Sequence, residues 1–454
     1  MLYRHFCEQL NAYLLHDLPV DAHFVLALSG GVDSRVMLSL LGRFKNQYPN
    51  YRYSAVYVHH GLSDNADHWQ KQCKNYSQQA DIPFYAEKVT LDLGAQVSIE
   101  QAARDARYQA LSNYIDENSV LLTGQHASDQ VETFLLALKR GSGPKGLSAM
   151  AELSDFYQGH LLRPFLSISQ ANIQEYAEHH NLDWIEDESN QDVRFDRNFI
   201  RHQITPLLRE RWPQIEKTVA RSAALCADQE ALLQSLLYER LQGMIGPDDS
   251  LSIKSLKQQA QPARDALIRM WLAKLGFLMP SEKQLQQLWQ DVALAKADAA
   301  PEFRYGRTQV GRFDNKLYVF AVADDLSSIV LDWNITTSLM LPDGLGQLSL
   351  VFAGKAPELE EGDLAFDLSL ESEVQHLQVI FSPSSITAQP ETRQHSRKLK
   401  KLLQEYKVPT WQRNRIPLLM DGEYLIAALG LFVCKAYSGC THQLVWHRSK
   451  LHKK

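Results

Sequence analysis

The feature that most constrains this chain is a glycine-containing turn between an apolar strand and a helix. An apolar run at residues 24–28 leads into the hexapeptide SGGVDS at residues 29–34, and helical apolar spacing follows at residues 35–44. Adjacent glycines let the backbone take positive φ and approach a ligand closely, and the free N–H groups at a helix start bind anions. The turn therefore predicts a phosphate-binding loop at the carboxyl end of a strand, where open α/β sheets bind ligands.

A tight strand–helix turn with Ser34 as its cap is the competing interpretation of the same residues. The turn is neither a Gly-Lys-Ser/Thr loop nor a Gly-x-Gly-x-x-Gly loop, which disfavours the usual kinase or GTPase loop and a dinucleotide-binding fold. Asp33 would repel a phosphate held in this loop unless a cation lay between them. An acidic residue at this position therefore indicates Mg²⁺ that bridges the carboxylate and the phosphates.

The first half of the chain alternates strand patterns and helix patterns. Further apolar strand candidates lie at residues 54–59, 82–89 and 120–123, and helical patterns lie at residues 98–117 and 130–139. Strands that alternate with helices predict a parallel, doubly wound sheet.

The second half has a different pattern. Helix candidates are followed by short strand candidates and an acidic segment, at residues 218–242, 262–277, 281–296, 303–305, 316–321, 348–352 and 354–363. We therefore expect an α/β fold in which a doubly wound parallel-sheet domain precedes a mainly helical domain and a small α+β C-terminal domain. The expected boundaries are residues 1–215, 216–330, 331–365 (a linker with short strands) and 366–454.

Charge is distributed unevenly along the chain. Residues 390–454 hold thirteen Lys and Arg against four Asp and Glu, a net charge of +9, so the remainder must sum to −15 to give the overall −6. A local basic surface of this kind suits a polyanion such as nucleic acid. A solvated charged face is the alternative interpretation.

The cysteine content and the lengths of the apolar runs limit the cellular compartments in which we expect this protein. The five cysteines include no Cys-x-x-Cys pair, which gives a zinc ribbon or a redox dithiol little support. Sparse cysteines are typical of a reducing compartment. The longest apolar run, residues 425–434, is about half as long as a membrane crossing requires. We expect a cytoplasmic protein with no membrane partner.

Residues 29–34 after an apolar strand resemble the PP-loop ATP pyrophosphatases, which split ATP into AMP and pyrophosphate. Further segments make the chain resemble one family in that group, the bacterial tRNA(Ile)-lysidine synthetases. The resemblance covers the first 210 or so residues and returns near the C-terminus, whereas the middle region matches only in kind. The matching segments are VHHGL at 58–62, AARDARY at 102–108, TGQHASDQVET at 123–133, RGSG at 140–143, DESN at 187–190, RNFIRH at 197–202 and KVPTWQRNRIPLL at 407–419.

The resemblance implies a two-step reaction that uses ATP and Mg²⁺. The wobble cytidine of a tRNA(Ile) with the CAU anticodon would be adenylated on its ring carbonyl oxygen, and free L-lysine would then displace AMP. A cytosine carbonyl oxygen is a poor leaving group, so catalysis would consist of positioning and electrostatics on the triphosphate. The oligomeric state stays open, with a homodimer as one option.

The resemblance also implies roles for single residues. Asp33 and Asp129 would be catalytic and would organise Mg²⁺ and the phosphates, and Arg104 would stabilise charge on the adenylate or the pyrophosphate. Carboxylates that stabilise a helix N-terminus, and a solvated ion pair on the helix of Arg104, are the structural alternatives. The residues expected to bind the nucleotide are Ser29, Gly30, Gly31, Val32, Asp33, Ser34 and His126.

Two basic stretches are the candidate tRNA surface. Basic residues interleaved with tryptophan suit contact with phosphates and stacking on bases. For Arg197 and Arg201, a helix-capping network is the alternative. The candidate tRNA-binding residues are Arg197, Arg201, Arg397, Lys400, Lys401, Trp411, Arg413 and Arg415.

Two positions depart from the family pattern, and other functions stay open. Gln125 stands where a second histidine is usual and Ser128 where an acid is common, so an altered metal contact at Ser128 is an option. Another PP-loop tRNA-modifying enzyme such as a tRNA thiolase is disfavoured by the missing Cys-x-x-Cys. A non-catalytic, ATP-responsive RNA-binding protein is disfavoured by the presence of both Asp33 and Asp129.

Overall fold

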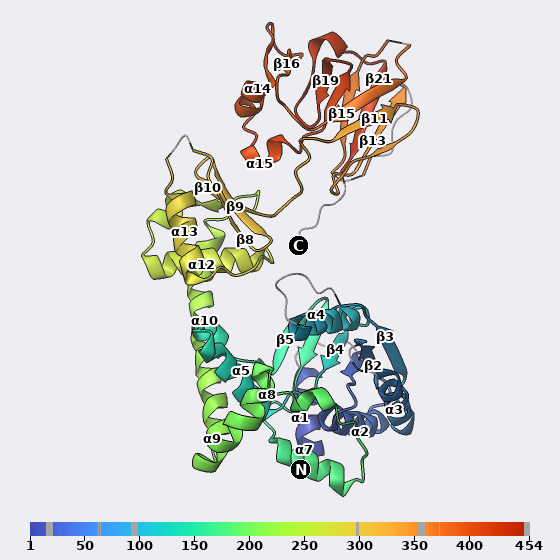
Figure 1. The fold of residues 1–454 in the computed structure, drawn as a ribbon, viewed down its shortest axis with the longest axis vertical. Helices are drawn as coiled ribbons and strands as arrows, with labels where there is room; N and C mark the ends of the chain where they lie inside the picture. The colour runs from blue at the N-terminus through green and yellow to red at the C-terminus, as the bar shows by residue number, and fades with distance from the viewer. Residues whose placement is uncertain are drawn as a thin grey trace. The chain divides into compact units, whose positions relative to one another are not determined.

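The computed structural model divides the chain into two compact units, Met1–Leu233 and Gln234–Lys454, which Figure 1 shows in ribbon form. The structure describes residues 1–14, 21–61, 63, 65–91, 99–296, 299–352, 359–360, 362–371 and 373–448.

A six-stranded sheet forms the centre of the first unit. Its order is β3-β2-β1-β4-β6-β5, and every neighbouring pair is parallel except β5 with β6. The predicted strands at 54–59, 82–89 and 120–123 agree with β2, β3 and β4 within two residues. The strands are β1 (His23–Ala27), β2 (Arg52–His59), β3 (Phe84–Lys88), β4 (Ser119–Leu122), β5 (Leu153–Phe156) and β6 (Gly159–Leu162).

Helices cover both faces of this sheet, so side chains alternate between two apolar cores. On β1, Phe24 and Leu26 face a core shared with α1, α2 and α7, while Val25 faces a core that includes Leu111 of α4. Burial on both faces is the condition for a parallel sheet, and the predicted doubly wound architecture is confirmed. These helices are α1 (Leu2–Leu14), α2 (Val32–Gln47), α3 (Ala66–Gln79), α4 (Ile99–Ser112), α5 (Ala127–Lys139) and α7 (Gln170–His179).

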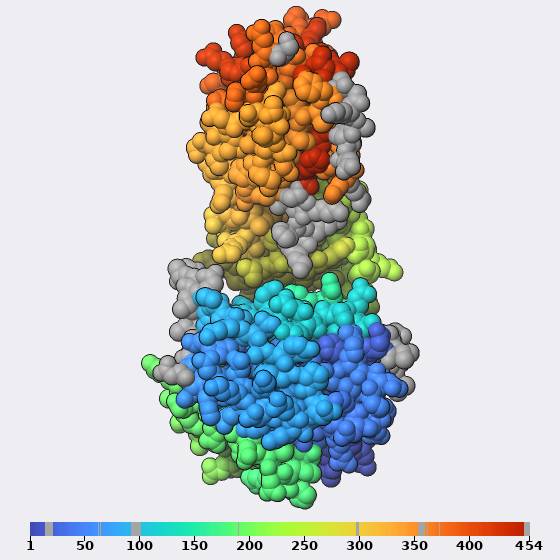
Figure 2. All heavy atoms as spheres, turned by 90° about the vertical axis from the view of Figure 1, so that its right-hand side faces the viewer, coloured from blue at the N-terminus to red at the C-terminus, as the bar shows by residue number. Residues whose placement is uncertain are grey.

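The strand β3 lies at one edge of the sheet, and its Tyr85 side chain is about half exposed. Residues coloured blue, which include α3 and β3, form the face of the first unit that Figure 2 turns to the viewer. The helix predicted over 98–117 ends at Ser112, because Asn113, Tyr114 and Ile115 form successive turns with backbone N–H groups that bond three residues back. Residue 98 lies outside the described residues.

Short helices lead from the sheet to a long helix, α10, which begins in the first unit and continues past Leu233. They are α6 (Pro144–Leu147), η1 (Glu188–Gln191), α8 (Asp196–Phe199), the π segment η2 (Ile200–Ile204), α9 (Thr205–Arg211) and α10 (Ile215–Gln242). The helix predicted over 218–242 corresponds to α10 and starts three residues earlier than predicted.

The second unit begins with helices packed on a four-stranded antiparallel sheet of order β7-β10-β9-β8. Trp271 is fully buried in the core between them. The helix predicted over 281–296 is divided into α13 and a π segment, and β9 has no counterpart among the predicted strands. The elements are β7 (Leu251–Ser252), α11 (Ile253–Lys257), α12 (Gln261–Lys274), α13 (Glu282–Gln287), η3 (Leu288–Ala293), β8 (Glu302–Tyr305), β9 (Thr308–Phe313) and β10 (Lys316–Ala321).

Two antiparallel sheets form the rest of the second unit. The five-stranded sheet β11-β15-β18-β19-β20 and the four-stranded sheet β12-β13-β21-β14 share one core, and α14 covers the outer face of the first sheet. The elements are β11 (Val330–Asn334), β12 (Leu339–Met340), β13 (Gln347–Phe352), β14 (Leu364–Leu368), β15 (His376–Ile380), β16 (Thr387–Ala388), β17 (Arg397–Lys398), α14 (Leu399–Glu405), α15 (Thr410–Arg413), β18 (Leu418–Asp421), β19 (Tyr424–Ala428), β20 (Phe432–Val433), η4 (Lys435–Tyr437) and β21 (His442–His447).

This C-terminal architecture agrees with the predicted α+β class but contains more sheet than the strand patterns indicated. The segment expected as a linker, 331–365, contributes β11 and β13, which pair along their lengths with β15 and β21. The acidic segment 354–363 lies largely outside the described residues. No helix among the described residues is long and apolar enough to cross a membrane.

Candidate active site

The glycine turn lies between the end of β1 and the start of α2, as the sequence predicts. Gly30 has φ +87°, and a Cβ there would lie 2.4 Å from Cδ1 of Ile185 and 2.9 Å from Sγ of Cys73. The Ile185 N–H also donates to the Gly30 carbonyl at 2.9 Å. Both the backbone conformation and the close packing therefore require glycine at this position.

The two serines of the turn have different roles in the structure. Ser34 is buried, accepts a hydrogen bond from the Gly30 N–H at 3.0 Å and donates to the Gly31 carbonyl at 3.0 Å. The Ser29 hydroxyl lies 3.1 Å from the Ser34 hydroxyl. Ser34 therefore shapes the loop from within, and Ser29 is the serine with hydrogen-bonding capacity left for a ligand.

Asp33, in the first turn of α2, has an incompletely satisfied carboxylate. Its side chain is 30% exposed, yet Oδ1 is buried and has no hydrogen-bond partner in the described residues. Oδ2 lies 3.9 Å from Nε2 of His126. Burial raises the pKa of Asp33, and the nearby Asp129 carboxylate raises it further, while His126 and Arg201 lower it. The free carboxylate is thus costly to ionise unless a cation joins it.

His126 and Asp129 form a capping box at the N-terminus of α5. The Ser128 N–H donates to Nδ1 of His126 at 3.2 Å, and the His126 N–H donates to Oδ2 of Asp129 at 3.0 Å. Because Nδ1 accepts, a neutral His126 carries its proton on Nε2, which lies 3.5 Å from Asp129 and faces Asp33. The structure therefore brings together three of the residues that the sequence analysis assigned to the nucleotide and metal.

Arg197 and Arg201, two candidate tRNA contacts, instead pair with a buried acid on α5. Glu132 is 1% exposed and accepts from Nε of Arg197 at 3.0 Å and from Nε of Arg201 at 2.6 Å. Arg201 also donates to Oδ1 of Asp129 at 3.0 Å. These pairs favour a positioning role over a tRNA contact, because a buried carboxylate needs its cationic partners.

Ser128 belongs to a separate polar network. Its hydroxyl donates to Oε1 of Glu216 at 2.9 Å and accepts from Nη2 of Arg209 at 2.6 Å, and Nε of Arg209 donates to Glu216 at 3.0 Å. A carboxylate from α10 thus lies next to the position where the sequence lacks the usual acid.

Unsatisfied polar atoms concentrate at the carboxyl edge of the sheet, where β1, β2, β4 and β6 end. Among the described residues, eight buried side-chain nitrogen or oxygen atoms have no hydrogen-bond partner. Native proteins leave few such groups, and their clustering at one edge indicates a place where a polar ligand binds. Five of the eight lie at this edge, on Asp33, His60, Thr123, Gln125 and Arg163.

His60 follows β2 and is held neutral. Nε of Arg107 donates to Nε2 of His60 at 3.1 Å. Burial, together with the charges of Arg107 and His59, lowers the pKa of His60 to about 4. Because Nε2 accepts, the neutral ring carries its proton on Nδ1, which is the unpartnered atom. This N–H is a donor available to a ligand.

Arg104 lies exposed on α4 and contacts Tyr108 one turn later. Its guanidinium carbon is 4.9 Å from the Tyr108 ring centroid, and Nη2 donates to the Tyr108 hydroxyl at 3.5 Å. Among the described side chains no carboxylate forms an ion pair with Arg104, and the side chain of Glu100, one possible partner in the alternative interpretation, lies outside the described residues.

The candidate tRNA-binding residues of the second unit differ in whether their charges are exposed or paired with other groups. Lys400 and Lys401 on α14 are exposed, whereas Arg397 pairs with Glu405 and Arg415 pairs with Asp343 at 2.7 Å. Arg413 donates through Nε to the Val408 carbonyl at 3.1 Å. Lys400 and Lys401 are therefore the members of this set with the freest charge.

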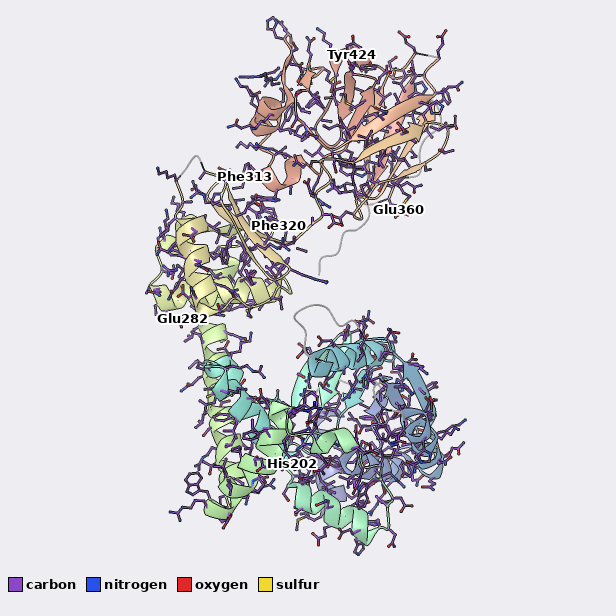
Figure 3. All side chains as sticks on the ribbon, viewed as in Figure 1. His202, Glu282, Phe313, Phe320, Glu360 and Tyr424 are labelled. Atoms are coloured by element: carbon purple, nitrogen blue, oxygen red, sulfur yellow. The ribbon has the colours of Figure 1, made fainter. Side chains whose placement is uncertain are left out.

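Trp411 packs inside the second unit. Its ring stacks on Phe320 with centroids 5.0 Å apart and also contacts Tyr318 and Phe313. Figure 3 labels Phe313 and Phe320 on the β9–β10 hairpin. A Cβ on Gly311 would lie 2.6 Å from Cζ3 of Trp411. One face of the Trp411 ring is thus already covered by Phe320, which favours a packing role for this residue.

Sequence reasoning missed Arg163, Glu132 as a buried partner of two arginines, and Glu216. Arg163 directly follows β6, a strand that had no counterpart among the predicted elements. Glu132 lies in the segment 123–133 that resembles the family, and with His126 and Asp129 it was expected to preserve the nucleotide and metal role, but its arginine partners were not predicted. Glu216 looked like an ordinary polar helix residue. The spacing of Asp129 and Glu132 on one helix face was the available signal that both carboxylates point the same way.

The residues present fit a magnesium ion only together with phosphate oxygens. Among the described residues no group of three His, Cys, Asp or Glu side chains could hold a metal alone. Magnesium is usually bound by one or two carboxylates plus phosphates and water. The unpartnered Oδ1 of Asp33 suits one such contact, whereas both oxygens of Asp129 already accept hydrogen bonds.

The parallel sheet, the glycine turn after β1 and the acidic residues facing it define a PP-loop, ATP-using protein. A model of the PP-loop domain matches residues 2–208. Models described as the TilS substrate binding domain and the TilS substrate C-terminal domain match residues 251–318 and 377–448.

Full-length relatives specify the family within that class. The tRNA(Ile)-lysidine synthase of Vibrio vulnificus (strain YJ016) is 48% identical, over 98% of this chain and 99% of that protein. The tRNA(Ile)-lysidine synthase of Vibrio campbellii (strain ATCC BAA-1116) is 47% identical, over 99% of each. The chain belongs to the tRNA(Ile)-lysidine synthase family. A solved U34-tRNA thiolase of Methanococcus maripaludis is 18% identical, covering 50% of this chain and 78% of that one, with a TM-score of 0.42.

Proposed function

We propose that this enzyme uses ATP to join free L-lysine to the wobble cytidine of tRNA(Ile) bearing the CAU anticodon, and that it does so in the cytoplasm. The first step forms a bond between the carbonyl oxygen on the cytosine ring and the α-phosphorus of ATP, and it breaks the α–β phosphoanhydride bond so that pyrophosphate leaves. In the second step the lysine amine forms a bond to the ring carbon, and AMP leaves with that oxygen. The products are lysidine, AMP and pyrophosphate.

The observation that carries the proposal is the glycine turn with the unpartnered Asp33 carboxylate beside it. The turn, with Gly30, Gly31 and Val32 at its centre, supplies N–H groups for a triphosphate at the start of α2, and we assign this role to Gly31 and Val32 because the Gly30 N–H donates to Ser34. Asp33 supplies an oxygen that has no other partner in the described residues. Mg²⁺ would neutralise charge between that oxygen and the phosphates.

We assign supporting roles to the other residues of this edge. The Nε2–H of His126 faces Asp33 and keeps its carboxylate oriented. Asp129 holds His126 through the capping box and receives Arg201. Arg104 is free to stabilise negative charge on the adenylate or on the departing pyrophosphate.

The exposed lysines of α14 are the part of the C-terminal region that we assign to tRNA binding. Lys400 and Lys401 carry charges that no described acid pairs with. Phosphate contacts of this kind give affinity without reading sequence. Arg197, Arg201, Arg397 and Arg415 are held by carboxylates in the structure, so we give them positioning roles.

The test is mass analysis of nucleosides from unmodified tRNA(Ile) incubated with ATP, Mg²⁺ and lysine. Lysidine should form, with AMP and pyrophosphate released only when tRNA is present. A sulfur donor or ammonia should not replace lysine, which separates this function from other PP-loop enzymes. The Asp33→Ala variant should lose tRNA-dependent AMP formation, and unchanged turnover in that variant would contradict the mechanism.

A further inference from the structure

Arg163 is a buried cation at the carboxyl edge that the proposed roles leave unused. Its side chain is 7% exposed, and Nη1 donates to the Ala151 carbonyl at 2.6 Å while Nε has no partner in the described residues. Buried arginines normally pair with an acid. No described carboxylate lies within ion-pair distance of this one.

The fold places Arg163 next to the other unsatisfied groups of this edge. Leu162 of β6 pairs with Leu122 of β4, and the Thr123 N–H donates to the Leu162 carbonyl at 3.2 Å. Thr123 and Arg163 are therefore neighbours at the ends of adjacent parallel strands. The Thr123 hydroxyl is itself buried and unpartnered, so the ends of two adjacent strands each carry a potential donor.

A second guanidinium lies close to the first. The Tyr108 hydroxyl accepts from Arg104 and also lies beside Arg163. Burial lowers the pKa of Arg163 and the charge of Arg104 lowers it further, whereas the interaction with Tyr108 raises it. Two like charges around one hydroxyl repel each other, and an anion between them would remove that repulsion.

We propose that Arg163, with Arg104 and the Thr123 hydroxyl, forms an anion site for a phosphate group, separate from the glycine turn. The inference rests on the proposed function, in which two phosphate sources reach this edge: a backbone phosphate of the tRNA and the pyrophosphate product. The planar fork of arginine suits the oxygens of either group.

The experiment compares the full-length wild type with Arg163→Gln and with a matched control, Arg312→Gln. Arg312 is also 7% exposed, but it donates to the backbone carbonyls of Ala295 and Lys296, so it needs no ligand. We would measure tRNA affinity against salt concentration, binding of inorganic pyrophosphate, the Michaelis constant for lysine, and urea unfolding.

A tRNA phosphate in the site predicts that Arg163→Gln reduces the slope of log affinity against log salt by roughly 0.7 to 0.9. Pyrophosphate in the site predicts instead that pyrophosphate binding weakens about tenfold or more while the salt slope stays at the wild-type value. Arg312→Gln should change neither quantity. If Arg163→Gln unfolds, the exposed Arg104→Gln variant should show the same loss in the same assay.

Two results would overturn the site. One is an Arg163→Gln variant that is less stable but keeps the wild-type salt slope and the wild-type affinity for pyrophosphate. The other is a raised Michaelis constant for lysine with unchanged phosphate binding, which would indicate a carboxylate ligand. Both binding assays work without turnover, so a wild type that made no lysidine would contradict the proposed function and leave this test intact.

Discussion

Asp33 illustrates at the scale of one residue how a functional group costs stability in the unliganded protein. Its carboxylate is mostly buried, one oxygen has no partner in the described residues, and Asp129 lies close. Ionising such a group without a cation is unfavourable. Its presence is explained by a ligand rather than by folding.

The Asp33→Asn variant should therefore be more stable than the wild type and inactive. An amide keeps the shape and removes the buried charge, so we expect the free energy of unfolding at neutral pH to rise by about 1 kcal/mol. Urea unfolding without nucleotide measures this, and pyrophosphate release measures the lost activity. The exposed Asp228→Asn should change neither, and a less stable Asp33→Asn would contradict the interpretation.

The same group predicts a pH dependence. The pKa of Asp33 is raised in the folded state, so the folded protein binds the proton more tightly than the unfolded chain. The contribution of Asp33 to stability is therefore full below its unfolded pKa and is lost as pH rises through its folded pKa. The stability difference between Asp33→Asn and wild type should grow from acidic to neutral pH, and a constant difference would contradict it.

Glu132 provides a second prediction for single residues. Removing Arg201 leaves this buried carboxylate with Arg197 as its remaining described partner, so Arg201→Met should lower the free energy of unfolding by about 3 kcal/mol. Adding Glu132→Gln should recover part of that loss, which a double-mutant cycle measures. The salt slope of tRNA binding should stay unchanged, whereas a reduced slope would return Arg201 to the tRNA surface.

The sequence was informative about the glycine turn because few functions other than phosphate binding explain adjacent glycines, a helix start and an acidic residue in one short segment. It was less informative about arginines. The pattern around Arg197 and Arg201 is the same whether the side chains meet RNA or a buried acid, and only the position of Glu132 in space separates the two. Arg163 could not be singled out from the sequence, because its significance depends on the lack of a described carboxylate near it in the folded structure.

At the scale of elements, the short helix α15 shows that a sequence pattern typical of nucleic-acid binding can instead stabilise packing inside the protein. Trp411 on this helix stacks on Phe320 of β10, and Gly311 of β9 leaves room for its ring. Aromatic residues among basic ones suit base stacking and protein packing equally well. The sequence alone could not choose between them.

A pair of substitutions tests that packing. Trp411→Ala should lower the free energy of unfolding by about 2–3 kcal/mol, and Gly311→Ala should lower it by about 1–3 kcal/mol because the new methyl group meets the ring. Gly311→Ala should be nearly neutral when combined with Trp411→Ala, since the obstructing ring is gone. Additive losses in urea unfolding would show that the two residues do not compete for the same space.

Elements of the first unit were easier to predict than those of the second. The strands β1, β2 and β4 are largely buried, and each contains an apolar stretch of at least three residues. Strands such as β11 and β14 are short and mixed in composition, and most of their residues are exposed or partly exposed. Their pairing is set by long-range contacts, which a local pattern does not contain.

For the whole molecule, the separation of charge along the chain predicts how tRNA binding responds to salt. The double variant Lys400→Ala, Lys401→Ala should weaken tRNA binding and reduce the salt slope by roughly one unit per lost phosphate contact. Arg397→Ala is the control, because its charge is already paired with Glu405. An unchanged slope in the double variant would remove α14 from the tRNA surface.

The hydrogen bond between Ser128 and Glu216 has a consequence for comparing related genes. The two side chains lie 2.9 Å apart although 88 positions separate them in the chain. An acid at position 128 would place two carboxylates against Arg209, so natural variants should exchange both residues together. Positions 128 and 216 should therefore covary in a large alignment of related sequences.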